Sequence, residues 1–332
     1  MASFFSRKPD LAIDFGTANL RVIRRDEGVV FDEPSLCCFS KSGVAPGLIA
    51  AGMSAQAMVD RTTGNLEIKR PLRRGVLQDI DSARELLRYA VPKALGRKRS
   101  GPVRTVIGVP ADATMAERSA LLTAARDAGI GSVRLVAEPF AAAIGAGLPV
   151  SAATGTMLVE CGAGTTEVAV LSLGGICLTR SVRIGGASLD QAIADSLHFR
   201  HKFLIGDTTA ERVKQDYVAQ RQTRPGAAGT IAVKGRSLTS GMPTTIDISL
   251  KELDTVVGRH VGEIVEVVLD VLGGTSPELS QDIHNHGIVL TGGSAVVPLI
   301  RSMLEDATGL RVVAADTPAQ CVPNGLHQML LH

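Results

Sequence analysis

The sequence predicts an α/β protein built from two similar lobes that enclose a cleft. Short apolar segments, typical of buried strands, alternate along the chain with segments that have the apolar periodicity of helices. A pattern of apolar strand, acidic residue, Gly/Thr turn and second strand occurs at residues 11–25 and again at residues 155–175. Two copies about half a chain apart indicate an internal duplication, and two homologous halves predict two lobes.

The individual elements follow from the spacing of the apolar residues. A buried strand is a short continuous apolar run, whereas an amphipathic helix has apolar residues three or four positions apart. Beyond the two repeated hairpins, we expect buried strands at residues 105–110, 133–139 and 288–295. We expect helices at residues 79–95, 115–128, 188–220 and 250–272.

The composition narrows the functional class. The 332 residues allow roughly two domains, and 45% apolar residues with no Trp predict an aliphatic core. A net charge of +2 does not support a nucleic-acid-binding protein. The five Cys have neither metal-site spacing nor a secreted disulfide pattern, so buried thiols are expected. Because the chain has neither a signal peptide nor eighteen uninterrupted apolar residues, we expect a cytoplasmic protein without a transmembrane helix.

The turn in each repeated hairpin suits a phosphate group. Small residues at a hairpin tip let backbone N–H groups approach phosphate oxygens, and a Thr hydroxyl adds a donor. A single turn of this kind is usually an ordinary hairpin, whereas a pair in duplicated halves is more specific. The acids before the turns, Asp14 and Glu160, suit a hydrated Mg²⁺, which keeps several waters and takes few carboxylates. We therefore predict a magnesium ion held across the cleft by Asp14 and Glu160 through water.

Several motifs resemble those of one known family. They are DFGTAN, AEPFAAAIGAGLPV, GTTEVAVLSLGG, LIGDTTAERVK, PELSQDI and GIVLTGGSAVV, and they run in order from residue 10 to about residue 325. The chain is similar to the MreB family of bacterial actins, within the wider superfamily of actin, sugar-kinase and chaperone ATPases. The resemblance implies an actin-like fold of duplicated ribonuclease-H-like core subdomains, with ATP and Mg²⁺ bound in the cleft between two lobes. The implied boundaries are 1–31, 76–150 and 316–332 for subdomain IA, 32–75 for IB, 151–185 and 246–315 for IIA, and 186–245 for IIB.

The resemblance also assigns the residues of the two phosphate loops. The first loop comprises Asp14, Gly16, Thr17, Ala18 and Asn19, and the second comprises Glu160, Gly162, Ala163, Gly164, Thr165 and Thr166. Glu138 is implied to orient the attacking water, with Thr165 as a second catalytic residue. Without the family, a carboxylate between a buried strand and a Pro is as readily explained as a helix cap.

Further nucleotide contacts are implied in the second half of the chain. These residues are Gly185, Gly186, Glu211, Lys214, Gly292, Gly293 and Ser294. The resemblance places Glu211 and Lys214 at the ribose and adenine, although their spacing alone favours a surface ion pair. A Gly-rich turn before a helix N-terminus, as at Gly292 and Gly293, is a natural anion contact. For Gly185 and Gly186 an ordinary strand-to-helix loop is the alternative.

The chain departs from the family pattern at several positions. Glu160 replaces an Asp, and Ala163 adds a Cβ where a Gly normally lets the backbone approach phosphate. Ala187, Pro323 and His327 also stand where the family usually has other residues. Together these changes suggest a divergent paralogue with slow hydrolysis.

The resemblance further implies filaments that bind the inner face of the cell membrane. The implied membrane contacts are the N-terminus, with Phe4, Phe5, Arg7 and Lys8, and a basic loop at residues 92–101, with Lys93, Leu95, Arg97, Lys98 and Arg99. Each basic residue near an anionic lipid surface contributes about 1 kcal/mol, and two weak patches together give reversible binding. A frayed terminus and solvated loop charges are the alternative. The apolar stretch 48–58 is a candidate filament contact, which core packing explains equally well.

The implied function is that of an ATP-dependent, membrane-associated cytoskeletal filament protein that organises cell-wall elongation and determines rod shape. Its partners would be further copies of itself, the membrane surface and membrane proteins of the cell-wall elongation complex, and no nucleic acid is expected. The alternative is a nucleotide-binding filament with little or no turnover, in which ATP is a structural switch. A kinase or chaperone-type ATPase would need an additional substrate-binding segment, and a DNA-segregating filament would need an adaptor that no sequence feature reveals.

Overall fold

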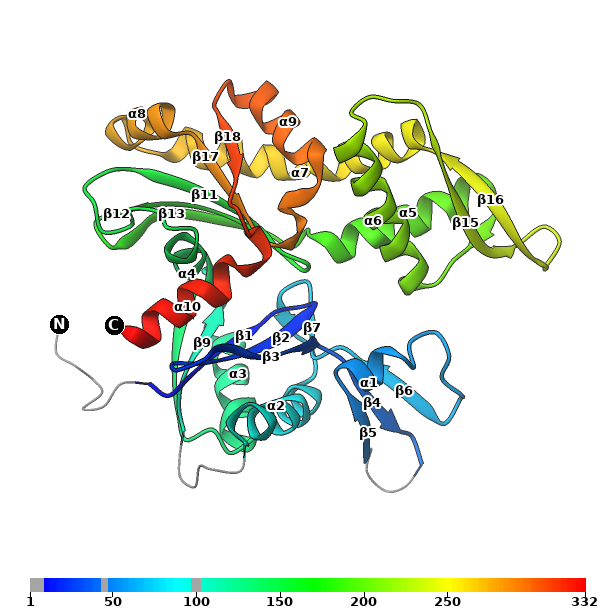
Figure 1. Ribbon diagram of the computed structural model, residues 1–332, viewed down its shortest axis with the longest axis horizontal. Helices are drawn as coiled ribbons and strands as arrows, with labels where there is room; N and C mark the ends of the chain where they lie inside the picture. Colours follow the sequence, from blue (N-terminus) through cyan, green and yellow to red (C-terminus); the bar gives the residue numbers. More distant parts are fainter. Residues whose placement is uncertain (1–8, 43–46, 97–102) are drawn as a thin grey trace.

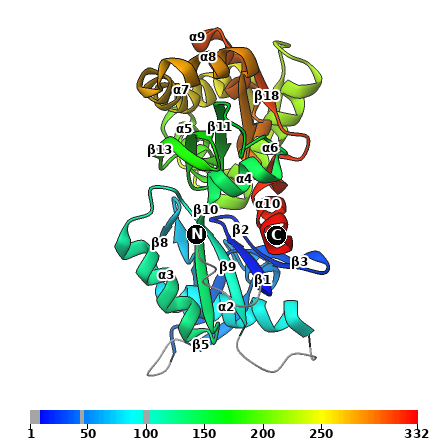
Figure 2. The same ribbon diagram turned by 90° about the vertical axis from the view of Figure 1, so that its left-hand side faces the viewer.

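The structure is a computed structural model that describes residues 9–42, 47–96 and 103–332. Two lobes are stacked in Figure 1, and the C-terminal helix α10 (Cys321–Leu331) lies between them. Each lobe is built around a five-stranded sheet with helices packed on it (Figure 2). The predicted α/β class is therefore confirmed.

The two large sheets have the same topology, which is direct structural evidence for the duplication. The strand order is β10-β9-β1-β2-β3 in the first sheet and β18-β17-β11-β12-β13 in the second. In both, a three-stranded antiparallel meander is extended from its first strand by two parallel strands. The first sheet comprises β1 (Leu11–Phe15), β2 (Asn19–Arg24), β3 (Gly28–Pro34), β9 (Arg104–Val109) and β10 (Ser132–Ala137). The second comprises β11 (Thr156–Cys161), β12 (Thr166–Ser172), β13 (Gly175–Val182), β17 (Ile288–Thr291) and β18 (Val312–Ala314).

The helices agree with the predicted spacing except in one segment. Those of the first half are α2 (Ile80–Leu95), α3 (Met115–Asp127) and α4 (Glu138–Gly145). Those of the second half, besides α10, are α5 (Gly186–His201), α6 (Asp207–Thr223), α7 (Leu250–Gly274), α8 (Pro277–His286) and α9 (Pro298–Thr308), with 3₁₀ turns η2 (Gly293–Val296) and η3 (Pro318–Gln320). The helix expected over 188–220 is two helices, because the strand β14 (Phe203–Leu204) interrupts it.

A smaller sheet accompanies each large one (Figure 1). The first smaller sheet has the order β5-β4-β6 and the second has the order β14-β15-β16. Their elements, with the short helix and hairpin beside them, are β4 (Cys37–Ser40), β5 (Gly47–Ala51), α1 (Met53–Gln56), β6 (Leu66–Lys69), β7 (Leu72–Arg73), β8 (Val76–Leu77), β15 (Thr230–Ser237) and β16 (Pro243–Ser249). The residue boundaries of the implied subdomains stay predictions.

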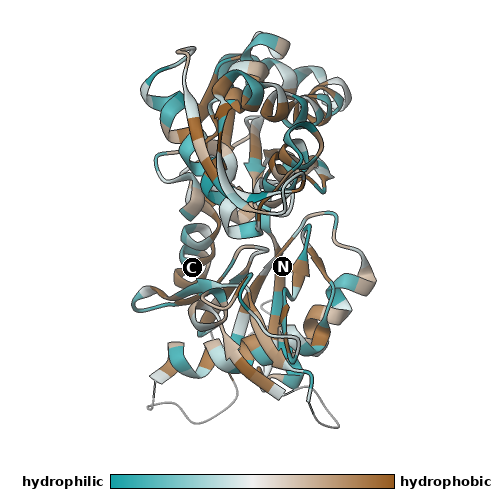
Figure 3. Ribbon diagram, turned by 90° about the vertical axis from the view of Figure 1, so that its right-hand side faces the viewer, coloured by the Kyte–Doolittle hydropathy of each residue, from teal (hydrophilic) through white to brown (hydrophobic). Residues whose placement is uncertain are grey.

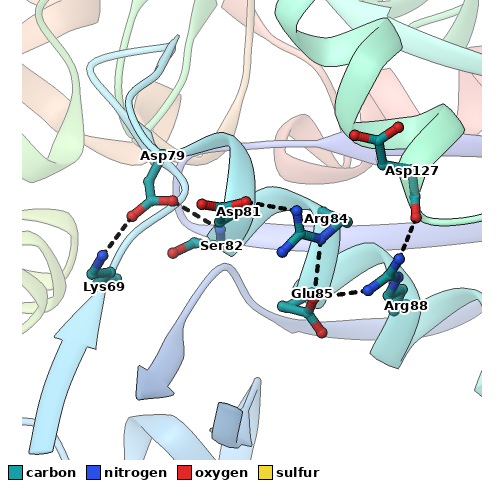
Figure 4. A network of polar contacts seen from close by, with 8 residues as sticks. All are labelled: Lys69, Asp79, Asp81, Ser82, Arg84, Glu85, Arg88 and Asp127. Atoms are coloured by element: carbon teal, nitrogen blue, oxygen red, sulfur yellow. Dashed lines mark hydrogen bonds and ion pairs between the residues drawn. The ribbon is translucent and has the colours of Figure 1, made fainter. Parts of the chain in front are cut away.

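Helix α2 begins at a cap that the sequence specifies. One carboxylate oxygen of Asp79 accepts a hydrogen bond from the Ser82 N–H at 2.9 Å, and the other pairs with Lys69 at 2.9 Å (Figure 4). An N-cap Asp satisfies a backbone N–H that has no partner within the helix, and its charge suits the positive end of the helix dipole. The first turn of α2 is thereby tied to β6 of the smaller sheet.

The prediction of a basic loop at residues 92–101 is wrong for residues 92–95, which are helical. Helix α2 continues through Pro92 to Leu95, because the buried Ala94 extends its apolar face. The Lys93 ammonium lies 3.8 Å from the Tyr89 ring centre and is thereby held against the protein. Arg97, Lys98, Arg99 and the N-terminal residues 1–8 lie outside the described residues.

The core is aliphatic, as predicted. Hydrophobic residues fill the strands inside each lobe and hydrophilic residues cover the outer helices (Figure 3). Four of the five Cys are buried, whereas Cys177 on the edge strand β13 is exposed, so the prediction of buried thiols is wrong for that residue. Within the described ranges, no helix combines the length and apolar character needed to cross a membrane.

Candidate functional site

A cleft between the two lobes contains most of the residues that the sequence assigned to nucleotide binding. It encloses about 1100 Å³ of space, part of it open to solvent. The assigned residues that line it are Asp14, Gly16, Thr17, Ala18, Asn19, Glu138, Glu160, Gly162, Ala163, Gly164, Thr165, Gly292 and Gly293. Apolar residues such as Leu72, Leu77 and Val322 complete the wall. A concave apolar cleft with a few convergent polar groups is the usual form of a small-molecule site.

The two repeated turns have the same backbone geometry. The Gly16 N–H donates to the Asn19 carbonyl at 3.0 Å, and the Gly162 N–H donates to the Thr165 carbonyl at 2.9 Å. A Cβ on Gly16 would lie only 3.0 Å from the Asn19 carbonyl oxygen, and a Cβ on Gly162 would lie only 3.0 Å from the Thr165 carbonyl oxygen. Both turns therefore favour glycine at their first position. The structure thus brings two equivalent phosphate-sized turns to one cleft.

The two turns also contact each other. The Thr17 hydroxyl accepts a hydrogen bond from the Gly75 N–H at 3.1 Å. Gly164 lies so close that a Cβ on it would overlap this hydroxyl and approach the Gly75 nitrogen to 2.6 Å. Gly75, with a φ of +72°, also packs against the Thr165 methyl group. The β7–β8 turn therefore joins the first-lobe turn to the second-lobe turn.

The cleft has more acidic than basic side chains. The acids that line it are Asp14, Glu117, Glu138 and Glu160, and the basic residues are Arg21 and Arg118. Arg21 is already paired with Asp14 at 2.9 Å and with Asp32 at 3.0 Å. Arg118 donates to the carbonyl groups of Ala111 and Ala113. A polyphosphate entering the cleft therefore needs an additional cation to balance its charge, which a metal ion supplies.

Burial governs the ionisation of the cleft acids. Burial, with the charge of Glu160 as the next cause, raises the pKa of Glu138 well above its usual range. Burial and the neighbouring Glu167 do the same to the pKa of Glu160. For Glu167 itself burial raises the pKa to about 8, although the Ala111 N–H bonds to its carboxylate. The three carboxyl groups approach one another at the start of α4, the end of β11 and the start of β12.

Three of the assigned residues support the second turn from behind instead of lining the cleft. The Gly186 N–H donates to the Gly162 carbonyl at 3.0 Å, and the Ser294 hydroxyl donates to the same oxygen at 3.0 Å. A Cβ on Gly185 would lie 2.6 Å from that carbonyl oxygen. Thr166 is fully buried, and its hydroxyl donates to the Ile184 carbonyl at 2.9 Å. Gly185, Gly186 and Ser294 therefore fix the shape of the turn.

Glu211 and Lys214 do not form the surface ion pair that their spacing alone favours. The Lys214 ammonium pairs with Asp190 at 2.8 Å and donates to the Gly186 carbonyl at 3.1 Å. Glu211 is exposed on α6 and accepts a hydrogen bond from Gln215. Lys214 thus reaches the rear of the second turn, and neither side chain lines the cleft.

Gly292 directly follows β17 and allows the backbone to pass close to Cys161, just before the second turn. Its φ is +83°, and a Cβ there would overlap the Cys161 carbonyl. Its N–H donates to the Pro318 carbonyl at 2.8 Å, which ties the start of η2 to η3. Gly293 has open space around its Cα and faces the cleft.

Two of the unusual C-terminal residues fit the fold. Pro323 lies in the first turn of α10, where its missing N–H would have no partner within the helix. The His327 ring contacts the Arg25 carbonyl in the β2–β3 turn at 3.1 Å.

Sequence reasoning missed Arg21, Glu167 and Gly75. Arg21 stands opposite Asp14 in the first hairpin, and Glu167 stands opposite Glu160 in the second. In each hairpin, a hydrogen bond between the first and fourth residues of the turn fixes the strand register. The residues opposite Asp14 and Glu160 could therefore have been predicted from the turn length. Gly75 carries no such signal, because its role depends on the meeting of the two lobes.

Comparison with known proteins agrees with the resemblance in the motifs. The model of the MreB/Mbl protein family matches residues 8–332. The cell shape-determining protein MreB of Escherichia coli (strain K12) is 39% identical over 320 residues, which cover 95% of this chain and 91% of that protein. The cell shape-determining protein Mbl of Bacillus subtilis (strain 168) is 34% identical over 322 residues, which cover 97% and 95%.

Solved structures show the same relationship. The crystal structure of MreB5 of Spiroplasma citri bound to ADP superposes with a TM-score of 0.88 at 30% identity, over 96% of this chain and 94% of that chain. The MamK double helical filament, at 22% identity and a TM-score of 0.78 over 97% and 98% of the two chains, shares the fold. With an actin-like fold and a family match over nearly its whole length, the chain belongs to the MreB/Mbl protein family.

Proposed function

We propose that this protein binds ATP with Mg²⁺ in the interlobe cleft and assembles into cytoskeletal filaments. On the proposal, the filaments lie at the inner face of the cell membrane, organise cell-wall elongation and determine rod shape. The observation that carries the nucleotide part is the pair of equivalent Gly/Thr turns, which meet at Thr17, Gly75 and Gly164 in an acidic cleft.

The relatives support both parts of this proposal. MreB5 of Spiroplasma citri has been crystallised with ADP and with AMPPNP. The related proteins from Escherichia coli and Bacillus subtilis are cell shape-determining proteins. The membrane proteins of the elongation complex are the further partners that this function requires.

The phosphate turns and the acidic residues of the cleft have different parts in the proposed reaction. The turns at Thr17 and Gly164 hold the phosphates by backbone N–H groups, as Gly-rich turns do in other phosphate sites. Glu138 orients the attacking water, and Thr165, which lines the same cleft, is the second catalytic residue of the proposal. A magnesium ion held by the carboxylates of the cleft would neutralise charge on the transferring phosphate, since phosphoryl transfer depends on positioning and electrostatic stabilisation. The acidic donor set of the cleft fits such an ion, because Mg²⁺ prefers carboxylate oxygens and water.

A second candidate function is a filament in which ATP acts as a structural switch with little turnover. Two observations favour it. Glu160 is one methylene longer than the Asp usual in the family, and its Oε2 is buried without a hydrogen-bond partner. Ala163 brings a Cβ to the phosphate side of the second turn.

Filament pelleting with parallel phosphate release tests the proposal and separates the two candidates. We expect wild-type protein to pellet with ATP and to release phosphate slowly, and Glu138→Gln to pellet without release. Glu266→Gln, an exposed change on α7, is the matched control and should behave as wild type. Wild-type polymer without phosphate release would favour the switch, and absence of both polymer and nucleotide binding would reject both candidates.

A separate experiment tests the apolar stretch at residues 48–58 as a contact between subunits of the filament. Ala51 and Ala55 are buried there, so core packing explains part of the stretch. Ile49 and Met53, however, are 56% and 59% exposed. Replacing Ile49 and Met53 by Glu should abolish pelleting and leave nucleotide binding unchanged, and pelleting that persists would exclude this contact.

Membrane binding is tested by co-sedimentation with vesicles that contain anionic lipid. Deleting residues 2–8 and neutralising Arg97, Lys98 and Arg99 should abolish binding. Binding that is unchanged in this variant would rule out the proposed patches.

A further inference from the structure

A groove runs between the helices α5 and α7, and its lining residues differ from those of the nucleotide cleft. It encloses about 1190 Å³ of space, part of it open to solvent. Its α5 side extends from Ser188 to Arg200, a length of about 18 Å at the usual helical rise. Its α7 side extends from Thr255 to Glu263. This length exceeds that of a single small ion and matches a short stretch of polypeptide.

Arginines from four different elements converge on the α5–α7 groove. Arg74 comes from the β7–β8 turn of the first lobe, Arg183 follows β13, Arg200 is on α5 and Arg259 is on α7. Arg183 pairs with Glu117 at 3.2 Å. In the part of the chain that the structure describes, the other three guanidinium groups form neither an ion pair nor a hydrogen bond. Because guanidinium groups bind carboxylates with two parallel hydrogen bonds, these three are available to an acidic ligand.

The acidic residues of the groove do not balance this charge. Asp195 and Glu263 also line it, so two carboxylates face three arginines even after Arg183 is paired with Glu117. Asp195 accepts a hydrogen bond from Gln191 of its own helix at 2.8 Å. The groove is therefore basic, although the chain as a whole has a net charge of only +2.

An exposed aromatic side chain lies in the same groove. Phe199 is 68% exposed, and it is the only exposed aromatic residue within the described ranges. The half-buried Ala192, two turns earlier on the same face of α5, and Val256 on α7 add apolar surface. Aromatic residues and Arg are the types enriched in protein–protein interfaces. The groove thus combines the features of a protein-binding surface.

We propose that the α5–α7 groove binds a short acidic segment of a partner protein. Carboxylates of the segment pair with Arg74, Arg200 and Arg259, and an apolar side chain of the segment packs on Phe199. A helical segment of about twelve residues fills the length of the groove, as amphipathic helices do in other grooves. Because Arg74 belongs to the first lobe and the other residues to the second, the segment contacts both lobes.

Charge favours a partner over another part of this chain. The segments outside the described residues are 1–8, 43–46 and 97–102. They contain Lys and Arg but no Asp or Glu, so they do not complement an arginine-rich groove. A second copy of this chain is the alternative occupant that the experiment has to separate.

Selection from a displayed library of random twelve-residue peptides tests the proposal on the full-length protein without nucleotide. We expect the recovered peptides to contain several Asp or Glu and at least one Leu or aromatic residue. Fluorescence anisotropy then gives the affinity of each labelled peptide. Replacing both Arg200 and Arg259 by Glu should weaken binding at least about tenfold, which corresponds to about 1.4 kcal/mol. Phe199→Ser should also weaken binding, and Asp195→Asn should strengthen it, because this change removes a carboxylate that repels the segment.

The matched control replaces Arg212 and Arg224 by Glu. These exposed arginines lie on α6 and at its C-terminal end, outside the groove, and the change in net charge is the same. This control should bind peptide as the wild type does. Urea unfolding confirms that each variant is folded, and a fluorescent ATP analogue reports separately on the cleft, which both double variants should leave unchanged.

Three results would overturn the inference. The first is a library that yields no binding peptide, and the second is equal peptide affinity in the two double variants. The third is a peptide of Glu alone that binds as tightly as the selected peptides, because the groove would then be only a non-specific anion patch. Loss of filament pelleting in the Arg200 and Arg259 double variant, with peptide binding unchanged, would instead assign the groove to a contact between copies of this chain.

Discussion

Gly145 and Gly325 face each other where α4 crosses α10, and the contact is symmetric. A Cβ on Gly145 would overlap the Cys321 carbonyl oxygen, and a Cβ on Gly325 would overlap the Ala141 carbonyl oxygen. Each glycine therefore packs against a backbone carbonyl of the other helix. Cys321 lies four positions before Gly325, and Ala141 lies four positions before Gly145. Since α4 follows β10 and α10 follows β18, the crossing joins equivalent helices of the duplicated halves. Glu138 begins α4, so the crossing also fixes one wall of the cleft.

Gly325→Ala should destabilise the protein by about 3 kcal/mol, because backbone atoms cannot move aside as a flexible side chain can. Urea denaturation measures the change in the free energy of unfolding. Gly262→Ala in α7 is the matched control, since nothing lies within 4 Å of its Cβ position. This control should be neutral or more stable by about 0.5–1 kcal/mol. Equal effects of the two changes would contradict the proposed packing.

Gly164→Ala should hold the two phosphate turns apart. Its Cβ would collide with the Thr17 hydroxyl and the Gly75 nitrogen, so the lobes could not close as they do here. We expect nucleotide affinity to fall by about tenfold or more, equivalent to about 1.4 kcal/mol, and small-angle scattering to show a more open molecule. Gly64→Ala has open space around it and should change neither quantity. A closed molecule with normal affinity in Gly164→Ala would refute this account.

Asp79→Ala should lower the free energy of unfolding by about 0.5–2 kcal/mol through loss of the α2 cap. The change also removes the ion pair with Lys69 (Figure 4). Asp81→Ala, two residues further on in the first turn of α2, leaves the cap in place, removes an exposed pair with Arg84 and should cost less than about 1 kcal/mol. Chemical denaturation of the two variants side by side tests the difference, and equal losses would argue against the cap.

Acid should destabilise the protein partly through His260 in α7. Burial first, and then the charge of Lys214, lower the pKa of His260 from 6.5 to about 4. The folded state therefore favours the neutral ring, and the unfolded state takes up a proton first as the pH falls. The contribution of His260 to stability is fully present above pH 6.5 and is lost as the pH falls towards 4.

The free energy of unfolding measured at several pH values tests this effect. Between pH 6.5 and 4 the wild-type slope should exceed that of His260→Gln by up to about 1.4 kcal/mol per pH unit, the value for one proton. His284→Gln, at an exposed position on α8, should keep the wild-type slope. Identical slopes for the wild type and His260→Gln would show that the ring is not protected in the fold.

Local patterns in the sequence were enough to predict most elements. The helices α2, α3 and α7 lie within two residues of their predicted ranges, because apolar periodicity and caps such as Asp79 act over a few residues. The prediction of one helix over residues 188–220 was wrong, because β14 interrupts it and forms only by pairing with the distant β15. The first part of the predicted basic loop was wrong because burial of Ala94 extends α2 past Pro92.

The sequence by itself determined the duplication, the α/β class and the two turns that begin at Gly16 and Gly162. These features depend on residue order within short segments, where a strand, an acid and a small turn residue follow one another. Only the tertiary structure decided that Glu138 approaches Glu160 and Glu167, and that Gly75 joins the two turns. The physical reason is that burial, ion pairing and close backbone approach depend on groups far apart in the chain. Their distances are fixed only when the two lobes pack together.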